Sequence, residues 1–472
     1  MATPGNASTI SSVIKTAMPW KRHFTETIQL TIPLVIGQVA IIAIWTVDIM
    51  MMGWISTEAL AAGTLGNRLY QPFYFFAIGL TIAVSPLVSQ ALGGGRRRIA
   101  RRVFRQGMWI AAAMGLITML PMWHGRVLLE LLGQNATAAS DAEPFLHMLA
   151  PGMIPTFVYF VMRNYASAYK RPLPPVLINL AGVGINALLN TWFAYGGFGV
   201  APMGLAGIGL ATSLTFTLMM LVLGLYIQLR PPFRFTRPFA RLYRLDAAII
   251  LRLLAVGGPI GILLLAETGM FIAAGFIVGL FGTIPLAAMG IANQIAAVTY
   301  MVPLAVSQAS TIRVGHHAGA GERIAVIRAG AAAVLLVVLA ALLLTMLVLA
   351  VPEMLIMLFL NPDDPQLEAV IRVALPMMMI VAILQLADGL QSVFTSILRG
   401  INDTRMPALL SLLCYWGVGI GSGIMLAFPL GLGPIGVWHG LLAGLCLASL
   451  LLGWRCLVFR RHLLAGGPIL QG

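Results

Sequence analysis

The chain has 472 residues, of which 59% are hydrophobic and only 9% are charged. Soluble domains carry about 25% charged residues, so the composition excludes a soluble protein and indicates an integral membrane protein. The net charge of +14 is compatible with a nucleic-acid partner only if the basic residues form a binding surface. Their positions along the chain indicate membrane topology instead.

A helix needs roughly 20 predominantly apolar residues to cross a bilayer, and the sequence contains twelve such runs. They lie near residues 28–52, 63–92, 103–123, 144–168, 174–196, 203–229, 250–281, 284–312, 326–351, 368–399, 406–429 and 434–459. We therefore expect an all-α integral membrane protein with twelve transmembrane helices. The first 27 residues lack an apolar core followed by a small-residue cleavage site, so no cleaved signal peptide is expected.

The basic residues lie almost entirely on one side of these spans. When the connections alternate between two sides, 25 of the 29 lysines and arginines fall on the side that holds both chain ends. Clusters within 96–105 and 230–252 supply twelve of them. The positive-inside rule places this side in the cytoplasm. We therefore expect a multi-pass inner-membrane protein with both termini cytoplasmic and with no nucleic-acid partner.

The two halves of the chain share a weak internal repeat. Asn67 in the second span recurs 226 positions later as Asn293, and Pro33 in the first span recurs at the same offset as Pro259. Six spans return the chain to the side from which it started, so two such halves have the same orientation. Parallel repeats of this kind are one known design of membrane transporters.

The repeat predicts two six-helix lobes related by a parallel pseudo-two-fold axis. We place an N-lobe at residues 28–229 and a C-lobe at residues 250–460, joined by a cytoplasmic linker at 230–249 that is rich in proline and arginine. Residues 1–27 and 461–472 are expected to form a cytoplasmic N-terminal segment and a cytoplasmic tail.

Three acidic residues, Asp48, Glu267 and Asp388, lie inside otherwise apolar spans. A carboxylate at the centre of a membrane helix costs about 2.5–3.5 kcal/mol on insertion scales. Such residues persist mainly where they face a wet cavity and bind a cation or a proton. These three acids therefore predict a transporter.

Glu267 and Asp388 form the candidate cation site of the second half. Glu267 lies about 15 residues into its span, which is roughly 22 Å at 1.5 Å per residue, and Asp388 lies at a comparable depth. Two carboxylates at like depth suit Na⁺, a proton or a cationic substrate. No arginine or lysine of this half is expected at a matching depth. A structural pair bonded to hydroxyls or to the backbone is the alternative interpretation.

Asp48 has a different set of expected neighbours in the first half. Asn186 and Asn190 in the fifth span are four residues apart, so they share one helix face, and they lie at a height comparable to that of Asp48. Amides can bond either protonation state of a carboxyl group, which suits a site linked to a proton or another cation. Interhelical hydrogen bonding by the asparagines is the alternative.

Other polar residues within the spans are expected to support the structure. Asn67, Asn293 and Gln294 are predicted to pair helices, because two of them belong to the repeat. Arg163, near the inner end of the fourth span, is predicted to extend its head group to the membrane surface. The sequence shows no Ser/His/Asp set and no metal-ligand spacing, so we expect neither an enzyme nor a cofactor.

Several motifs resemble those of multidrug and toxic compound extrusion transporters, in particular the NorM-like branch. The segment from Ala287 to Gln294, with Arg313-Val314-Gly315-His316 after it, resembles the eighth-span signature of that family. Asp48 followed by Gly53 and by Leu60-Ala61-Ala62 is similar to its first and second spans. Asp388 followed by Leu398-Arg399-Gly400 and Asp403-Thr404-Arg405 is similar to its tenth-span motif. The similarity extends over residues 28 to 460.

The resemblance implies a monomeric antiporter that exports amphipathic organic cations in exchange for Na⁺ or H⁺ by alternating access. It implies that Asp48 with Asn186 and Asn190 forms the polar site of the N-lobe, and that Glu267 and Asp388 form the cation site of the C-lobe. NorM-like proteins can carry a tyrosine four residues before the tenth-span aspartate. Here that position is Leu384, so the choice between Na⁺ and H⁺ stays open.

Two other kinds of transporter are alternatives. A lipid-linked oligosaccharide flippase of the same superfamily would need arginines in its cavity for anionic headgroups, and the intramembrane acids disfavour it. A transporter of the major facilitator type has similar half symmetry, but its Asp-Arg-x-Gly-Arg-Arg loop signature is missing after Ala91.

Overall fold

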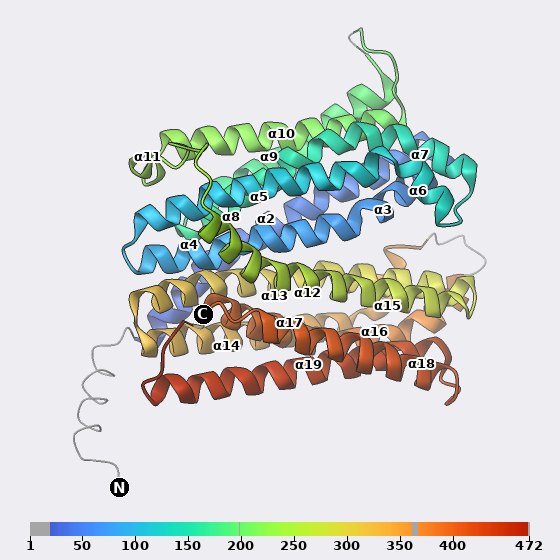
Figure 1. The fold of residues 1–472 in the computed structure, drawn as a ribbon. Coiled ribbons are helices and arrows are strands. Elements are labelled where there is room, and N and C mark those ends of the chain that lie inside the picture. Colours follow the sequence, from blue (N-terminus) through green and yellow to red (C-terminus); the bar gives the residue numbers. More distant parts are fainter. Residues whose placement is uncertain (1–18, 198, 361–366, 471–472) are drawn as a thin grey trace. The chain divides into compact units, whose positions relative to one another are not determined.

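The computed structural model describes residues 19–197, 199–360 and 367–470 of the chain (Figure 1). Residues 1–18 of the expected N-terminal segment and residues 471–472 of the expected tail lie outside this range. The fold is all-α, as the sequence predicts, with only an isolated bridge between Gly197 and Val200 besides the helices in the part described.

Within the described residues, twelve helical segments are long and apolar enough to cross a membrane, which confirms the expected number. They are α2 (Trp20–Ile55), α3 with α4 (Thr57–Ile82, Val84–Gly93), α5 (Arg97–Trp123), α7 with α8 (Ala136–Leu149, Met153–Ala168), α9 (Leu173–Tyr195), α10 (Leu205–Leu229), α12 (Ala247–Gly279), α13 (Thr283–Ala320), α14 (Arg323–Ala350), α16 (Leu367–Gly400), α17 with the π-helical η2 and α18 (Arg405–Leu412, Leu413–Ile420, Gly421–Ala427), and α19 (Gly433–Leu464). Shorter helices lie in the connections: α6 (Gly125–Leu131), α11 (Phe233–Thr236) and α15 (Pro352–Met357).

Local sequence signals set several helix ends. The Ser56 hydroxyl accepts a hydrogen bond of 3.0 Å from the Ala59 amide at the start of α3, and the Asn135 side chain caps α7 through the Thr137 amide at 2.8 Å. Serine and asparagine satisfy otherwise free N–H groups at such ends. Gly321 ends α13 in the left-handed conformation, with φ of 79°, which glycine adopts without a steric penalty.

The described residues pack into two compact units. We call the first the N-unit, which holds Ile36–Leu92 and Arg96–Leu265, and the second the C-unit, which holds the chain up to Val35, Gly93–Gly95 and the chain from Ala266 onward. Helices α2 and α12 each contribute residues to both units. The lobe and linker boundaries that we drew from the sequence stay a prediction.

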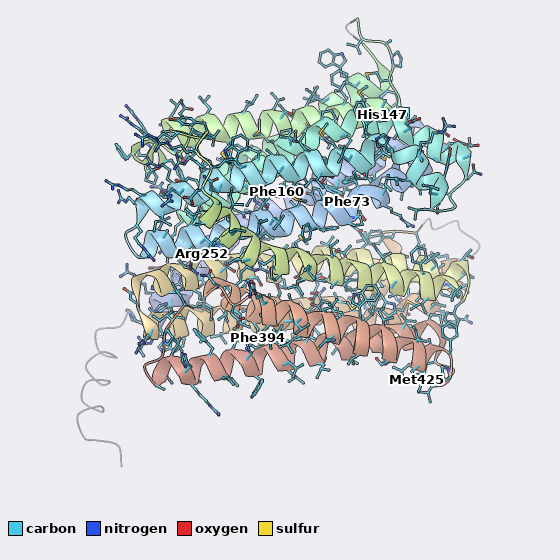
Figure 2. The ribbon with its side chains drawn as sticks, in the orientation of Figure 1. Phe73, His147, Phe160, Arg252, Phe394 and Met425 are labelled. Carbon is cyan, nitrogen blue, oxygen red and sulfur yellow. The ribbon has the colours of Figure 1, made fainter. Side chains whose placement is uncertain are left out.

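The N-unit has an aromatic centre. Helix α10 packs against α7, α8 and α9, and α5 packs against α8. Tyr74 of α3 contacts the rings of Trp45, Phe157 and Phe160 at centroid distances of 5.2, 5.7 and 6.4 Å. Figure 2 labels Phe160, which lies on α8. Aromatic pairs at these distances stabilise a core beyond their buried area.

The C-unit has close helix packing through small residues. Helix α13 packs against α14 and α16, and α19 packs against α16, η2 and α18. A Cβ atom added at Gly440 of α19 would lie 2.3 Å from the Cα atom of Gly423. Small residues let membrane helices approach this closely, which supplies van der Waals contact where lipid provides no hydrophobic driving force.

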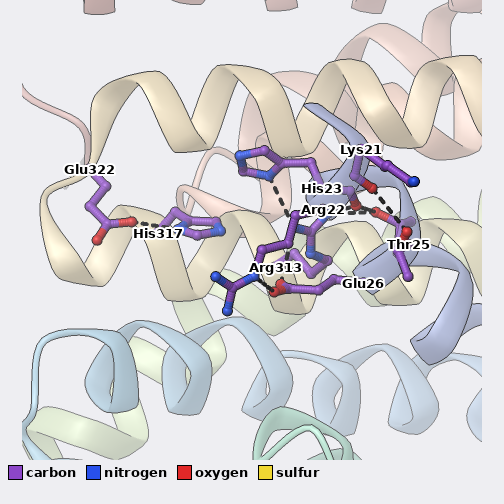
Figure 3. Close-up of polar contacts among 9 residues, drawn as sticks. Lys21, Arg22, His23, Thr25, Glu26, Arg313, His317 and Glu322 are labelled. Atoms are coloured by element: carbon purple, nitrogen blue, oxygen red, sulfur yellow. Dashed lines mark hydrogen bonds and ion pairs between the residues drawn. The ribbon is translucent and has the colours of Figure 1, made fainter. Parts of the chain in front are cut away.

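A buried arginine holds the first part of α2 within the C-unit (Figure 3). Arg313 of α13 is 1% exposed and donates hydrogen bonds of 2.6 Å to both the His23 carbonyl and the Thr27 hydroxyl. It also forms an ion pair of 3.3 Å with Glu26. A buried guanidinium is stable only with such partners, so Arg313 of the segment Arg313-Val314-Gly315-His316 has a structural use here.

A second arginine holds the later part of α2 within the N-unit. Arg163 of α8 is 6% exposed and donates a 2.6 Å hydrogen bond to Gln38, and the Asn179 amide donates one of 3.0 Å to the Gly37 carbonyl. The expectation that Arg163 reaches the membrane surface is therefore wrong. Its head group stays inside because Gln38 gives it a buried acceptor and Phe160 lies 5.8 Å beneath it.

Candidate functional site

The N-unit brings together the three polar residues that the sequence predicts for its site. Both Asn186 and Asn190 of α9 donate hydrogen bonds to one carboxylate oxygen of Asp48 on α2, at 3.1 and 2.8 Å. Thr212 of α10 donates to the other oxygen at 2.7 Å. The spacing of four residues places both asparagines on one face of α9. Asp48 is therefore held by donors from two neighbouring helices.

Thr212 is a member of this site that sequence reasoning missed. Asn186 also contacts the Thr212 hydroxyl at 3.4 Å, and Asn190 contacts the Asn186 amide oxygen at 3.2 Å. The amide oxygen of Asn190 is buried without a partner in the described structure. The network thus has a free acceptor beside a carboxylate, which is suited to a proton or to a donor on a ligand.

A small cavity of about 20 Å³ lies beside Asp48. Its walls combine the polar groups Asn67, Thr156 and Thr212 with aromatic and apolar side chains. The lining residues are Trp45, Asp48, Met52, Asn67, Tyr70, Tyr74, Phe145, Leu149, Met153, Thr156, Thr212 and Phe216. Asn67, which we expected only to pair helices, therefore shares this cavity with Asp48. Aromatic faces and a carboxylate are the groups that attract organic cations.

The C-unit places Glu267 of α12 and Asp388 of α16 close enough to interact electrostatically. Asp388 is 8% exposed and Glu267 is half-buried. The Oδ1 atom of Asp388 is buried without a hydrogen-bond partner among the described residues. Leaving a buried charged acceptor unsatisfied is costly, so this oxygen is suited to bind a cation or to carry a proton.

Two tyrosines that sequence reasoning missed lie beside the carboxylate pair. Tyr300 of α13 and Tyr415 of η2 both interact electrostatically with Glu267 and Asp388. The Tyr300 hydroxyl donates a 3.2 Å hydrogen bond to Ser392. Phenols from other helices thus approach the pair, whereas Leu384 occupies the position four residues before Asp388 on α16.

Tyr415 lies in the π-helical segment η2, which packs against α12 beside Glu267. Trp416, the next residue, donates a 3.1 Å hydrogen bond to the Ala266 carbonyl, directly before Glu267. A Cβ atom at Gly269 would lie 3.0 Å from the Trp416 ring, so α12 and η2 are in close contact there. Single π-helical turns inside α-helices are frequent at functional sites. Apart from the presence of Tyr415 itself, the sequence gives no indication of this π-helical segment.

Arg399 is a cation that the sequence did not place near the pair. It lies on α16 about three turns from Asp388, and its charge acts on both Glu267 and Tyr300. Arg399 lies about three turns from Asp388 along the helix, so the prediction that no arginine or lysine of this half lies at a depth matching the carboxylates stays a prediction. Arginine reaches this far because its side chain is long and carries its charge at the end.

The residues of the pair suit a hard cation. Two carboxylates with the hydroxyls of Tyr300 and Ser392 nearby are oxygen donors, which Na⁺ and similar ions prefer over nitrogen or sulfur. Among residues 19–197, 199–360 and 367–470, no group of three or more His, Cys, Asp or Glu residues could hold a metal ion. A transition-metal centre is thus not indicated in that part of the chain, whereas a weakly held, exchangeable ion fits a two-carboxylate site.

The remaining predicted residues lie outside these hydrogen-bond networks. Asn293 of α13 is half-buried, and its amide oxygen has no partner in the described part of the chain. Gln294 is exposed. The helix-pairing role that we expected for both residues stays a prediction.

Comparison with known proteins identifies relatives over most of the chain. A sequence model of the MatE family matches residues 33–192 and 259–425. A Brucella suis protein named a probable multidrug resistance protein NorM is 35% identical over 452 residues, which is 95% of this chain and 95% of that protein. A protein of the same name from Mesorhizobium japonicum is 37% identical over 435 residues, which is 92% of this chain and 93% of that protein.

Solved transporter structures share the fold. The structure of the eukaryotic MATE transporter AtDTX14 has a TM-score of 0.84 at 18% identity and covers 95% of this chain and 98% of its own. A MOP superfamily transporter from Pyrococcus furiosus has a TM-score of 0.85 at 17% identity and covers 93% of this chain and 96% of its own. At such identities the likeness concerns the fold alone.

Proposed function

Because this chain belongs to the MatE family, we propose that it is a cation-coupled multidrug efflux transporter of the inner membrane. It exports amphipathic organic cations in exchange for Na⁺ or H⁺ by alternating access. It works as a monomer with both termini in the cytoplasm, and it is a transporter rather than an enzyme. The observation that carries the proposal is the buried, unpaired Oδ1 of Asp388 beside Glu267.

The coupling ion binds at the carboxylate pair of the C-unit. Two adjacent anions in a medium of low dielectric repel each other, and a Na⁺ ion or a proton relieves that repulsion. Glu267 and Asp388 would supply carboxylate oxygens, while Tyr300 and Ser392 would supply hydroxyl oxygens. The ion has to leave as easily as it enters, which favours this small donor set over a full coordination cage.

The organic cation binds among the residues that line the small cavity of the N-unit, which has to widen to admit it. Trp45, Tyr70 and Tyr74 offer aromatic faces to a positive charge, and Asp48 offers a carboxylate. Met52 and Met153 add adaptable apolar surface for ligands of different shape. The names of the relatives from Brucella suis and Mesorhizobium japonicum, which refer to multidrug resistance, support this substrate class.

The polarity of this cavity favours export of cations over lipid-linked oligosaccharide flipping. An anionic diphosphate headgroup needs arginine or lysine contacts. Among the described residues, the wall of the cavity has one carboxylate and no arginine or lysine. Membership of the MatE family also removes the major-facilitator alternative, which rested on a similar half symmetry and a similarly basic loop between the second and third spans.

Transport by the purified full chain in proteoliposomes tests the proposal. Ethidium is the fluorescent organic cation, and a Na⁺ gradient and a pH gradient are imposed separately. We expect one gradient to drive ethidium transport, and we expect Glu267→Gln and Asp388→Asn each to abolish it. Glu353→Gln, which removes an exposed acid at the start of α15, is the matched control and should transport normally. Gradient-driven transport at the normal rate in both site variants would refute the assignment of the coupling site.

A further inference from the structure

The linker between α10 and α12 is bound to the N-unit through its own backbone. Side chains of α5 donate hydrogen bonds to five linker carbonyls. They run from Arg101 to Thr236 at 3.2 Å, from Arg105 to Ala240 and Arg241 at 2.7 and 2.9 Å, from Gln106 to Arg244 at 2.9 Å, and from Trp109 to Leu242 at 2.8 Å. A surface loop held at so many carbonyls has a defined conformation.

The same contacts leave the arginines of the linker available. The side chains of Arg234, Arg237, Arg241 and Arg244 are exposed, and within the described part of the chain none of them has a hydrogen-bond or ion-pair partner. Asp246 is the only acid within residues 230–249, and Arg102 of α5 binds it. The linker therefore presents four cations that no anion of the described chain neutralises.

The backbone conformation of the linker is unusual at two of these arginines. Arg237 and Arg241 have φ values of 44° and 60°, in the left-handed region that residues with a side chain rarely adopt. Such a conformation costs of order 1–3 kcal/mol and persists where the surroundings impose it. The hydrogen bonds from Arg101 to the Thr236 carbonyl and from Arg105 to the Ala240 and Arg241 carbonyls lie at or next to these two residues.

A groove lies between the end of α10 and the linker. Gln228, Arg234, Phe235, Arg237, Pro238 and Phe239 line it. Phe235 is 75% exposed, and Tyr243 and Leu245 nearby are 74% and 66% exposed. The groove thus combines two free guanidinium groups with an uncovered aromatic ring, which a site for a small soluble anion does not need.

The place of the groove in the chain determines which anion reaches it. The span of α10 ends at Leu229 and that of α12 begins at Ala247, so the linker lies at the membrane surface, where lipid headgroups are found. A guanidinium binds phosphate through two hydrogen bonds, and basic pockets between membrane helices bind acidic headgroups. We propose that this groove binds the headgroup of an acidic phospholipid, with Arg234 and Arg237 on the phosphate and Phe235 against the upper acyl chain.

Native mass spectrometry of the full chain in detergent tests this site. Dioleoyl-phosphatidylglycerol and dioleoyl-phosphatidylcholine are added separately, and the bound lipid is counted. We expect phosphatidylglycerol to bind the unaltered chain, and Arg234→Gln with Arg237→Gln to reduce its affinity about 10- to 30-fold. The matched control is Arg460→Gln with Arg461→Gln, which removes the same charge from exposed positions at the end of α19 and should bind normally.

Three results would overturn the proposal. They are equal phosphatidylglycerol binding by the groove variant and the control, equal binding of phosphatidylcholine by the unaltered chain, and displacement of the lipid by millimolar inorganic phosphate, which would make the site one for a soluble anion. If the double variant does not fold, Phe235→Ser replaces it. Because that ring is exposed, the substitution should leave the fold intact and weaken phosphatidylglycerol binding at least twofold, whereas unchanged binding would reject the acyl-chain contact.

Discussion

The guanidinium of Arg313 donates a 2.6 Å hydrogen bond to the Thr27 hydroxyl, so a fully buried cation joins α13 to the first part of α2. The arginine lies 286 residues from its partner in the sequence. Arg313 also binds the His23 carbonyl and Glu26. These hydrogen-bond and ion-pair partners all lie on α2.

Removing this arginine should destabilise the protein. Arg313→Ala removes the one cation that bonds the His23 carbonyl, the Thr27 hydroxyl and Glu26 together, and we expect a loss of about 2–4 kcal/mol. Thr27→Val removes one of several bonds and should cost about 1 kcal/mol. The melting temperatures of the two single variants and of the double variant give a double-mutant cycle, which measures the coupling between the two side chains. Strictly additive effects would show that the two side chains are not coupled.

Replacing the acid of the N-unit should abolish transport without unfolding the site. In Asp48→Asn the amide oxygen can still accept from Asn186 and Asn190, and the Thr212 hydroxyl can reverse to accept from the new amide. We expect ethidium transport to fall at least 10-fold, because the negative charge is lost, while the melting temperature stays within a few degrees. The control Asp141→Asn alters an exposed acid of α7. Normal transport by Asp48→Asn would show that its charge is not needed.

The hydroxyl of Tyr300 should contribute to ion binding. Tyr300→Phe removes the oxygen that lies near Glu267 and Asp388 and that bonds Ser392. We expect the concentration of coupling ion at half-maximal transport to rise about 3- to 10-fold, since one hydrogen bond or ligand contributes about 1 kcal/mol. Tyr243→Phe, at an exposed position, provides the control. An unchanged ion dependence would remove Tyr300 from the site.

Removing the positive charge of Arg399 should have the opposite effect on ion binding. The guanidinium competes with the coupling ion for the field of Glu267, so Arg399→Gln should lower the half-maximal ion concentration about 3- to 10-fold. Ion binding is measured by the concentration dependence of ethidium transport in proteoliposomes. Arg405→Gln, at an exposed position at the start of α17, serves as the comparison. A higher half-maximal ion concentration in Arg399→Gln would mean that the arginine helps to organise the site and does not compete with the ion.

The glycine contact between α18 and α19 should be intolerant of a methyl group. A Cβ at Gly440 would lie 2.3 Å from Gly423, whereas a Cβ at Gly421 would meet nothing within 4 Å. We expect Gly440→Ala to cost about 1–3 kcal/mol through overpacking and to lower the melting temperature by several degrees. Gly421→Ala should be neutral or slightly stabilising. Equal melting temperatures would contradict the close contact.

The parts of the site that follow helical periodicity could be predicted from the sequence. Asn186 and Asn190 share a face because they are four residues apart, and Asp48 is conspicuous because a carboxylate within an apolar span is costly. The number of spans follows from hydropathy for the same reason: lipid tolerates only helices whose backbone groups are bonded internally.

The contacts between spans distant in sequence could not be predicted in this way. Thr212 and Tyr300 are ordinary residues of their helices, and only tertiary packing brings them to Asp48 and to the carboxylate pair. The prediction for Arg163 was wrong because its position near the end of a span favours extension to the membrane surface. Its buried partner Gln38 lies 125 residues away in the sequence and could not be foreseen. Tyr415 lies in a π-helical turn, which periodicity arguments based on 3.6 residues per turn do not detect.

The proline of α2 lies between the two arginine contacts of that helix. Pro33 has no N–H, so one backbone bond is missing between Thr27, which Arg313 holds, and Gln38, which Arg163 holds. The helix is therefore softest in the short stretch that neither arginine supports. Asp48 lies 15 residues beyond Pro33, about 22 Å along the axis. Because Gln38 and Asp48 lie on the same side of the proline and in the same unit, bending at Pro33 leaves the hydrogen bonds of Asp48 to Asn186, Asn190 and Thr212 intact.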